Sequence, residues 1–238
     1  MAVFPRIEDA GHTVSAIIAA GIVPATMEIM DNTTIRCVES HLNIGLPVEA
    51  DAILLIQVDD EEEVVEKHMA QVAQMCCQGG AERVESARTD SEIDALWKAR
   101  QSVTPSLTKL KPHKVGEDIT VPRSQVTAMI VRIGEIAREY GLPIAIFGHA
   151  GDGNLHPNIL YDRRNQEEVV HVQAAIGEIF RAAIALGGTL SGEHGVGLSK
   201  QAYLEAGVGP LGIEVMRNVK RALDPKGILN PGKIFSEA

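Results

Sequence analysis

The sequence has little aromatic content, few cysteines and no long apolar run. Aromatic residues make up 3% of its 238 residues, so a core must be built from Ala, Ile, Leu and Val. Its three cysteines, Cys37, Cys76 and Cys77, form neither a disulfide framework nor a CxxC pair. This use of cysteine is typical of a reducing compartment, and we expect a cytoplasmic protein.

Two further absences exclude whole classes of partner. No apolar run approaches the roughly 18 residues of a membrane span, and the first residues do not read as a signal peptide. The net charge is −10, and Lys and Arg do not cluster. An acidic chain without a basic patch is a poor ligand for nucleic acid or for an anionic membrane surface. We therefore expect neither a nucleic-acid partner nor a transmembrane segment.

The overall amino-acid composition is that of an ordinary globular protein. Hydrophobic residues account for 45% of the chain and charged residues for 23%, which excludes a disordered chain. Linkers, fixed-period repeats and low-complexity segments are not visible in the sequence. We therefore expect one compact domain over residues 1–238.

Hydrophobic periodicity and turn residues predict a mixture of helices and strands. The predicted helices span residues 7–20, 24–38, 59–78, 92–100, 122–140 and 163–186, with two shorter helices after residue 197. The predicted strands span residues 52–58, 83–87, 119–121, 143–147 and 155–161. Some strands follow each other directly and others are separated by helices, which indicates an α+β or mixed α/β fold.

Histidine and acidic residues cluster in two segments, of which the first, residues 147–158, reads FGHAGDGNLHPN. Its Asp-Gly pair between two apolar runs is a strong hairpin signal. A hairpin would make His149 and His156 cross-strand neighbours. Asn158 lies two residues after His156, so a strand would place both side chains on one face.

The second segment, residues 187–197, reads GGTLSGEHGVG and places Glu193 next to His194 in a glycine-rich loop. Two imidazoles and a carboxylate form a site with open coordination positions, which suits Zn²⁺ or another divalent transition ion. Spacing alone leaves an alternative open, because a histidine beside glycines is often a hydrogen-bonded turn residue. For Arg100 and Lys114, the default interpretation is surface charge.

Three ordered motifs resemble a known family. GHAGDGNLHPN, SGEHGVG and the tail DPKGILNPGKIF look like the C-terminal substrate domain of FAD-linked 2-hydroxyacid oxidoreductases. These enzymes are related to vanillyl-alcohol oxidase and include D-lactate dehydrogenases, D-2-hydroxyglutarate dehydrogenases and glycolate oxidase D subunits. The opening FPRIEDAGHTVSAIIAAGIVPATMEIMD also fits, so the resemblance runs from about Phe4 to Phe235. It implies a ferredoxin-like α+β fold with helices flanking an antiparallel sheet.

The resemblance also implies a mechanism in which a small D-2-hydroxy acid, such as glycolate or D-lactate, loses a hydride from C2 to the flavin N5. The positions that match divalent-metal ligands are His149, His156 and Glu193, with zinc the preferred ion. His194 matches the general base. The positions that match substrate-binding residues are Arg100, Lys114 and Asn158, and those expected near the flavin are Gly195 and Asn230.

One departure from the family concerns the flavin. The N-terminal FAD-binding domain of the family is missing from these 238 residues, and none of their segments matches a cradle for adenine and pyrophosphate. We therefore expect FAD to be held by a separate domain or subunit and the isolated chain to be inactive. The alternatives are a non-catalytic subunit or metal-binding module and, as a weaker option, a metal hydrolase. A homo-oligomer also fits the sequence.

Overall fold

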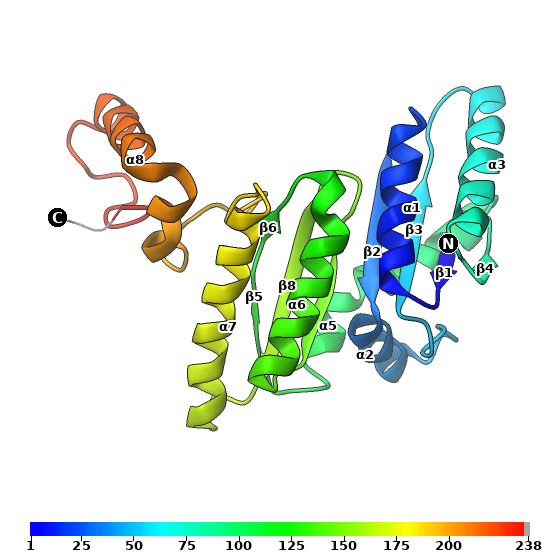
Figure 1. Ribbon diagram of the computed structural model, residues 1–238, viewed down its shortest axis with the longest axis horizontal. Coiled ribbons are helices and arrows are strands. Elements are labelled where there is room, and N and C mark those ends of the chain that lie inside the picture. Colours follow the sequence, from blue (N-terminus) through cyan, green and yellow to red (C-terminus); the bar gives the residue numbers. More distant parts are fainter. Residues whose placement is uncertain (236–238) are drawn as a thin grey trace.

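The computed structural model describes residues 1–235, and its central feature is one antiparallel sheet (Figure 1). The strands are β1 (Ala2–Phe4), β2 (Thr26–Asp31), β3 (Ala52–Gln57), β4 (Arg83–Val84), β5 (His113–Gly116), β6 (Ile119–Thr120), β7 (Ile144–His149) and β8 (Asn154–Tyr161). They lie in the order β4-β1-β3-β2-β7-β8-β5, and β6 also pairs with β8.

Helices connect most of these strands. In chain order they are α1 (Ile7–Ala19), α2 (Asn32–Leu42), α3 (Glu62–Gln78), α4 (Asp90–Gln101), α5 (Val103–Leu107), α6 (Val126–Tyr140), α7 (Gln166–Ala185) and α8 (Leu204–Leu223). Short 3-10 turns, η1 (Arg123–Gln125) and η2 (Gln201–Tyr203), precede α6 and α8.

The sheet consists of two similar halves, each with a ferredoxin-like order of strands. In the first half the chain runs β1-α1-β2-β3-α3-β4, with α2 added between β2 and β3, and the strands lie in the order β4-β1-β3-β2. The second half runs β6-α6-β7-β8-α7, and a bridge between Thr120 and Thr189 stands where a fourth strand would be. The expected α+β fold, with helices flanking an antiparallel sheet, is confirmed.

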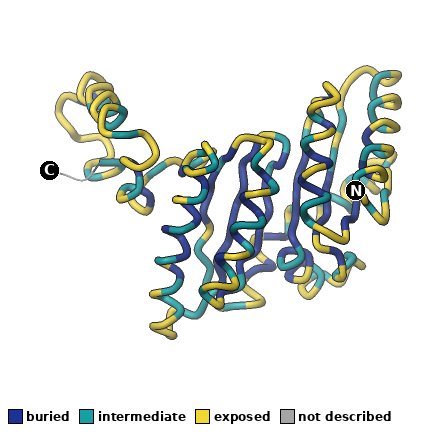
Figure 2. The backbone as a smooth tube through the Cα atoms, viewed as in Figure 1, coloured by how far each residue is buried: buried dark blue, intermediate teal, exposed yellow. Residues whose placement is uncertain are grey.

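Helices cover both faces of the sheet, and a core lies under each layer (Figure 2). The helices α1, α3, α6 and α7 pack over the larger core, whose buried side chains include Ile17, Ile29, Leu54, Met129 and Phe180. The helices α2, α4 and α5 pack over the smaller core, whose buried side chains include Met30, Ile35, Leu107, Phe147 and Leu160. Successive side chains of a strand point to opposite faces, and this alternation divides each strand between the two cores.

The segment 24–38 differs from its prediction. The sequence predicts one helix here, whereas the structure has strand β2 followed by helix α2. Met27 and Ile29 lie in the larger core and Met30 lies in the smaller one, which is the period of a strand. The prediction of a helix is therefore wrong for residues 24–31, because the pairing of β2 with β3 on one side and with β7 on the other decides the conformation of this segment.

The other predicted elements are present with shifted ends. The predicted strand 83–87 is reduced to two residues, and the helix predicted from residue 59 begins at Glu62. Strands β1 and β5, which are three and four residues long, are not predicted from the sequence. Strands this short carry too few residues for a period-two pattern to stand out.

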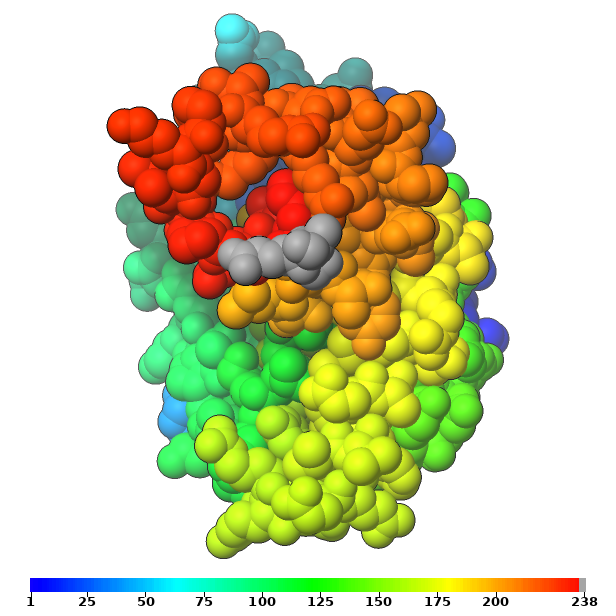
Figure 3. All heavy atoms as spheres, turned by 90° about the vertical axis from the view of Figure 1, so that its left-hand side faces the viewer, coloured from blue at the N-terminus to red at the C-terminus, as the bar shows by residue number. Residues whose placement is uncertain are grey.

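Helix α8 and the chain after it lie beside the sheet rather than on it (Figures 1 and 3). Gly209 has a φ of 70° and precedes Pro210, so α8 consists of two helical pieces joined at a kink. This agrees with the two shorter helices predicted after residue 197. The large apolar side chains exposed here are Val208, Leu211, Val215, Val219, Leu223, Ile228 and Leu229. Such a row is typical of a face that another surface covers.

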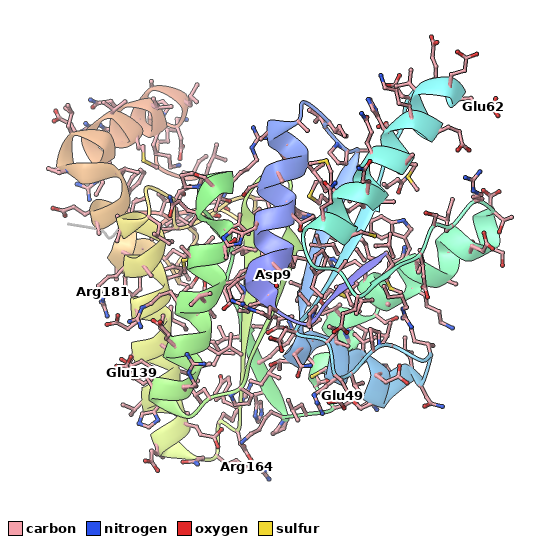
Figure 4. The ribbon with its side chains drawn as sticks, turned by 45° about the vertical axis from the view of Figure 1, so that its right-hand side comes forward. Asp9, Glu49, Glu62, Glu139, Arg164 and Arg181 are labelled. Carbon is pink, nitrogen blue, oxygen red and sulfur yellow. The ribbon has the colours of Figure 1, made fainter. Side chains whose placement is uncertain are left out.

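Several charged side chains lie on the outer faces of the helices. Figure 4 shows Glu62 on α3, Glu139 on α6 and Arg181 on α7 pointing away from the sheet. Within residues 1–235, none of the helices combines the length and the apolar character that crossing a membrane requires.

Asp31 allows a test of the junction between β2 and α2. Its buried carboxylate accepts a hydrogen bond from the Thr34 N–H at 2.8 Å, and burial raises its pKa from 3.8 to about 6. The folded state thus holds this proton more tightly than the unfolded chain, so stability is lost as pH rises through this range. Asp31→Asn keeps the N-cap without the charge. We expect its free energy of unfolding to exceed that of wild type by up to about 3 kcal/mol at pH 8 and to equal it at pH 4.

Urea unfolding at both pH values measures this difference, with Asp51→Asn at an exposed position as the control. A difference between Asp31→Asn and wild type that does not change with pH would contradict the raised pKa.

Candidate functional site

The two candidate histidines meet at one end of the sheet, where β7 passes to β8. The hairpin predicted from the Asp-Gly pair is confirmed, with His149 at the end of β7 paired with Asn154 at the start of β8. His156 pairs with Phe147, so the histidines are diagonal neighbours, and their ring centres lie 5.4 Å apart. The loop after α7 brings Glu193 to the same end of the sheet.

His149 is oriented by a buried carboxylate on the neighbouring strand. The register of β2 and β7 places Glu28 opposite His149, and the Glu28 carboxylate is hydrogen-bonded to His149 Nδ1. Arg100 of α4 donates from Nε to the other Glu28 oxygen at 2.7 Å, which compensates the buried negative charge. An imidazole that donates from Nδ1 to a carboxylate presents a lone pair at Nε2, as a metal ligand must.

Glu193 completes a group of three side chains with metal-ligand chemistry. Its Oε1 lies 3.4 Å from His156 Nε2 and 4.0 Å from His149 Nε2, and one ligand atom from each residue lies within 4.8 Å of the others. Burial, followed by the nearby His149, lowers the pKa of His156 and so favours its neutral form. Two neutral imidazoles and a carboxylate fit a divalent transition ion and leave coordination positions for a substrate.

His194 lies beside this group and is more exposed than the other two histidines. Its side chain is 58% exposed, against 36% for His149 and 9% for His156. Its ring stacks on that of His156, with centres 5.4 Å apart and planes inclined by 16°. An exposed imidazole next to these three side chains can exchange a proton with a molecule that reaches them.

The loop that carries Glu193 and His194 is anchored by the buried carboxylate of Asp118. Its Oδ2 accepts hydrogen bonds from the Ser191 hydroxyl at 2.6 Å and from the N–H groups of Glu193 at 3.1 Å and His194 at 2.9 Å. Its Oδ1 accepts from Asn154 Nδ2 at 2.7 Å. Burial by itself would raise the pKa of Asp118, but these hydrogen bonds outweigh it and hold the pKa well below its usual range.

Lys200 supplies the positive charge of this buried group. Its Nζ donates to the backbone carbonyls of Asp118 and Leu190, both at 2.7 Å. The same nitrogen lies 3.7 Å from Asp118 Oδ2 and 3.9 Å from Glu117 Oε2. Burial lowers the pKa of Lys200, and the two carboxylates oppose that effect. Lys200 therefore joins the loop after α7, at Leu190, to the segment that leads into β6, at Asp118.

Two of the predicted substrate-binding residues are in contact. Lys114 Nζ donates to Asn158 Oδ1 at 3.1 Å, and Asn158 Nδ2 donates to the His156 carbonyl at 2.9 Å. Asn158 and His156 lie two residues apart on β8 and share a face, as their spacing predicted. Burial lowers the pKa of Lys114, and such a partly desolvated ammonium group suits a substrate carboxylate.

The third predicted substrate-binding residue, Arg100, faces the same end of the sheet. Its guanidinium carbon lies 4.7 Å from the centre of the Phe147 ring, and its Nε is paired with Glu28. This places Arg100 beside His149, because Glu28 contacts both residues. Its default interpretation as a surface charge is wrong, since its side chain is only 17% exposed.

The two residues expected near the flavin lie in different segments, which a hydrogen bond from the Ile234 N–H to the Gly197 carbonyl at 2.8 Å joins. Gly195 has a φ of +80° and donates its N–H to Ser191 Oγ at 2.7 Å, so it belongs to the loop of Glu193. Asn230 lies in the tail after α8. Within residues 1–235, its described hydrogen bond is to Lys233 and does not join it to the histidines.

Three residues that support the site were not predicted from the sequence. Glu28 lies in a segment predicted as helix, although an acidic residue inside the apolar run TMEIMD is a signal once the run is treated as a strand. Asp118 precedes a two-residue strand, and its contacts come from loops far along the chain. Asn154 directly follows the Asp-Gly pair and has the appearance of an ordinary turn residue.

Comparison with known proteins now identifies the family. Residues 1–234 match the family described as FAD linked oxidases, C-terminal domain. The chain belongs to this family. The glycolate oxidase subunit GlcD of Bacillus subtilis is 47% identical over 237 residues, which cover 100% of this chain and 50% of that protein. The probable mitochondrial D-lactate dehydrogenase of Danio rerio is 31% identical over 98% of this chain and 47% of that protein.

A comparison with solved structures shows the same fold in a known enzyme. A crystal structure of p-cresol methylhydroxylase with substrate bound has a TM-score of 0.68 and covers 98% of this chain and 51% of that one. At 15% identity, this likeness shows a shared fold. The chain spans about half the length of the curated relatives it matches.

A substitution at Gly192 can test how closely the loop after α7 approaches the sheet. A Cβ here would lie 1.5 Å from Asn154 Nδ2 and 2.4 Å from Thr120 Oγ1. Gly192→Ala must therefore shift the loop or the side chains it meets, and we expect the free energy of unfolding to fall by about 1–3 kcal/mol. Gly134→Ala on α6 is the control, because a Cβ there meets open space. We expect this helical substitution to raise stability by about 0.5–1 kcal/mol.

Chemical denaturation of both variants measures these changes. Equal or higher stability of Gly192→Ala relative to wild type would contradict the close contact between the loop and Asn154.

Proposed function

We propose that this chain is the substrate- and metal-binding part of an FAD-dependent D-2-hydroxyacid dehydrogenase or oxidase, with glycolate or D-lactate as the substrate. The observation that carries the proposal is the group of His149, His156 and Glu193 with His194 stacked beside it. Relatives named as a glycolate oxidase subunit and a D-lactate dehydrogenase support this class of substrate.

His149, His156 and Glu193 would hold the divalent ion, with Zn²⁺ the preferred choice. Their chemistry fits, since two nitrogen ligands and one carboxylate oxygen converge and Glu28 keeps His149 Nε2 available. When bound, the ion would polarise the hydroxyl oxygen of the substrate and lower its pKa.

The other residues would orient the substrate and move its proton. Arg100 and Lys114 would bind the carboxylate, and Asn158 holds the Lys114 ammonium group in place. His194 would take the hydroxyl proton while a hydride leaves C2, which converts the hydroxy acid into the 2-oxo acid. FAD, when bound, supplies the acceptor for that hydride.

A flavin-binding domain or subunit is the partner that this proposal requires. The relatives are about twice as long as this chain, which supports an additional unit. The apolar side chains exposed along α8 offer a surface that such a unit can cover, and examples are Leu211 and Val215.

The metal ligands can be tested without flavin. We expect the purified chain to bind about one Zn²⁺ per molecule and His149→Ala/His156→Ala to lose this binding, because Glu193 alone is an incomplete site. Calorimetry and metal analysis after dialysis measure the stoichiometry. The control is His12→Ala/His68→Ala, which removes two imidazoles outside the group. Equal metal content in the first double variant and wild type would refute the ligand set.

The adjacent residues His194 and Glu193 have separable effects in the flavin-bound enzyme. If His194 is the base, His194→Ala should leave metal binding intact and slow flavin reduction by roughly 10²–10⁴-fold. Glu193→Ala should instead weaken metal affinity, because a ligand is lost. Stopped-flow flavin reduction and metal analysis on both variants measure the two effects. Loss of metal from His194→Ala, with normal reduction once metal is added in excess, would reverse the assignment.

A further inference from the structure

Asp118 occupies the gap between two short strands at the site. The register that pairs Gly116 of β5 with Asn158 continues in β6, where Ile119 pairs with Leu155, so Asp118 lies opposite His156. The residue next to His156 is a proline, which has no N–H to donate to this edge. The Glu117 N–H still donates to the Pro157 carbonyl at 2.9 Å, but the reciprocal bond is missing. The Asp118 side chain is hydrogen-bonded to the loop after α7.

The main chain of Glu193 and His194 is anchored by hydrogen bonds, while their side chains contact His156 and lie more than half exposed. The side chains are 53% and 58% exposed, so the protein interior does not fix them. Their consecutive N–H groups both donate to Asp118 Oδ2. Successive backbone donors aimed at one point form a favourable site for an anion, and here the anion is a buried carboxylate of the same chain.

We propose that Asp118 is a positioning residue that sets where Glu193 and His194 lie relative to His156. The inference rests on the function proposed above for that pair. The carboxylate accepts from the Ser191 hydroxyl and from Asn154 as well, so a single charge joins the loop to the hairpin. Hydrogen bonds to an ionised acceptor are roughly twice as strong as neutral ones, and removing the charge should loosen the loop first.

Asp118→Asn in the full chain removes this charge and keeps the shape of the side chain. In the metal-free protein, we expect hydrogen exchange at the N–H groups of Glu193 and His194, followed by NMR, to become about tenfold faster. Exchange within β7 should not change. Calorimetry should show that Zn²⁺ affinity falls by roughly tenfold, because the ligand Glu193 loses its anchor. A residue that contributes only to global stability would not accelerate exchange at these two positions alone.

Glu117→Gln is the matched control. Glu117 is a buried acid next to Asp118 and lies 3.9 Å from the same lysine, Lys200, but its described contacts do not include the loop N–H groups. We expect this variant to leave exchange at the N–H groups of Glu193 and His194 unchanged. Ser191→Ala tests the same anchor from the loop side if Asp118→Asn fails to fold, and it should also accelerate exchange at both positions.

Unchanged exchange at Glu193 and His194 in Asp118→Asn would overturn the proposal, and so would an equal effect of Glu117→Gln. If Asp118→Asn does not fold, unchanged exchange in Ser191→Ala overturns it. The exchange experiment needs no metal ion. A wild-type chain that binds no Zn²⁺ would therefore contradict the proposed function, while the positioning role is still decided by exchange.

Discussion

The pairing of β2 with β7 is the contact on which the rest of the structure depends. It joins the two ferredoxin-like halves into one sheet, with Glu28 opposite His149 and Met30 opposite Phe147. Because a shift by one residue would turn every side chain to the other face, this register fixes which residues enter the cores and which reach the site. The apolar positions of both strands are buried, so burial of the two cores holds Glu28 against His149.

Two buried carboxylates then order the site from opposite sides. Glu28 acts on a side chain, since it binds His149 Nδ1, whereas Asp118 acts on a main chain, since it accepts from the N–H groups of the Glu193 loop. Each buried charge has a cation beside it, Arg100 for Glu28 and Lys200 for Asp118. A buried carboxylate without such compensation would be costly, so the cations are part of the same construction.

The fold could be predicted from the sequence more fully than the residues that support the site. Long elements such as α7, and the hairpin around its Asp-Gly turn, were predictable because their signals are local. The segment 24–31 was not, since its conformation depends on strands more than twenty residues away. The histidines and Glu193 were singled out by their clustering in two glycine-rich segments, and the resemblance to a family supplied their expected roles. The supporting carboxylates, Glu28 and Asp118, were missed because their partners lie far along the chain and become neighbours only after folding.

The distribution of exposure around the site has a chemical consequence. The groups that anchor it, Glu28 and Asp118, are buried, while His194 and Glu193 remain more than half exposed. A hydride leaving a substrate here would need a neighbouring acceptor and a surrounding from which water is excluded. In the proposed enzyme, the histidines anchored by Glu28 and the loop anchored by Asp118 would form one wall of such a pocket, and the exposed sides of His194 and Glu193 would face its open side. The proposed flavin-binding partner would supply both the hydride acceptor and the other wall of the pocket. Because the site would be divided between two units, the buried charges of this chain must hold its half in the right geometry.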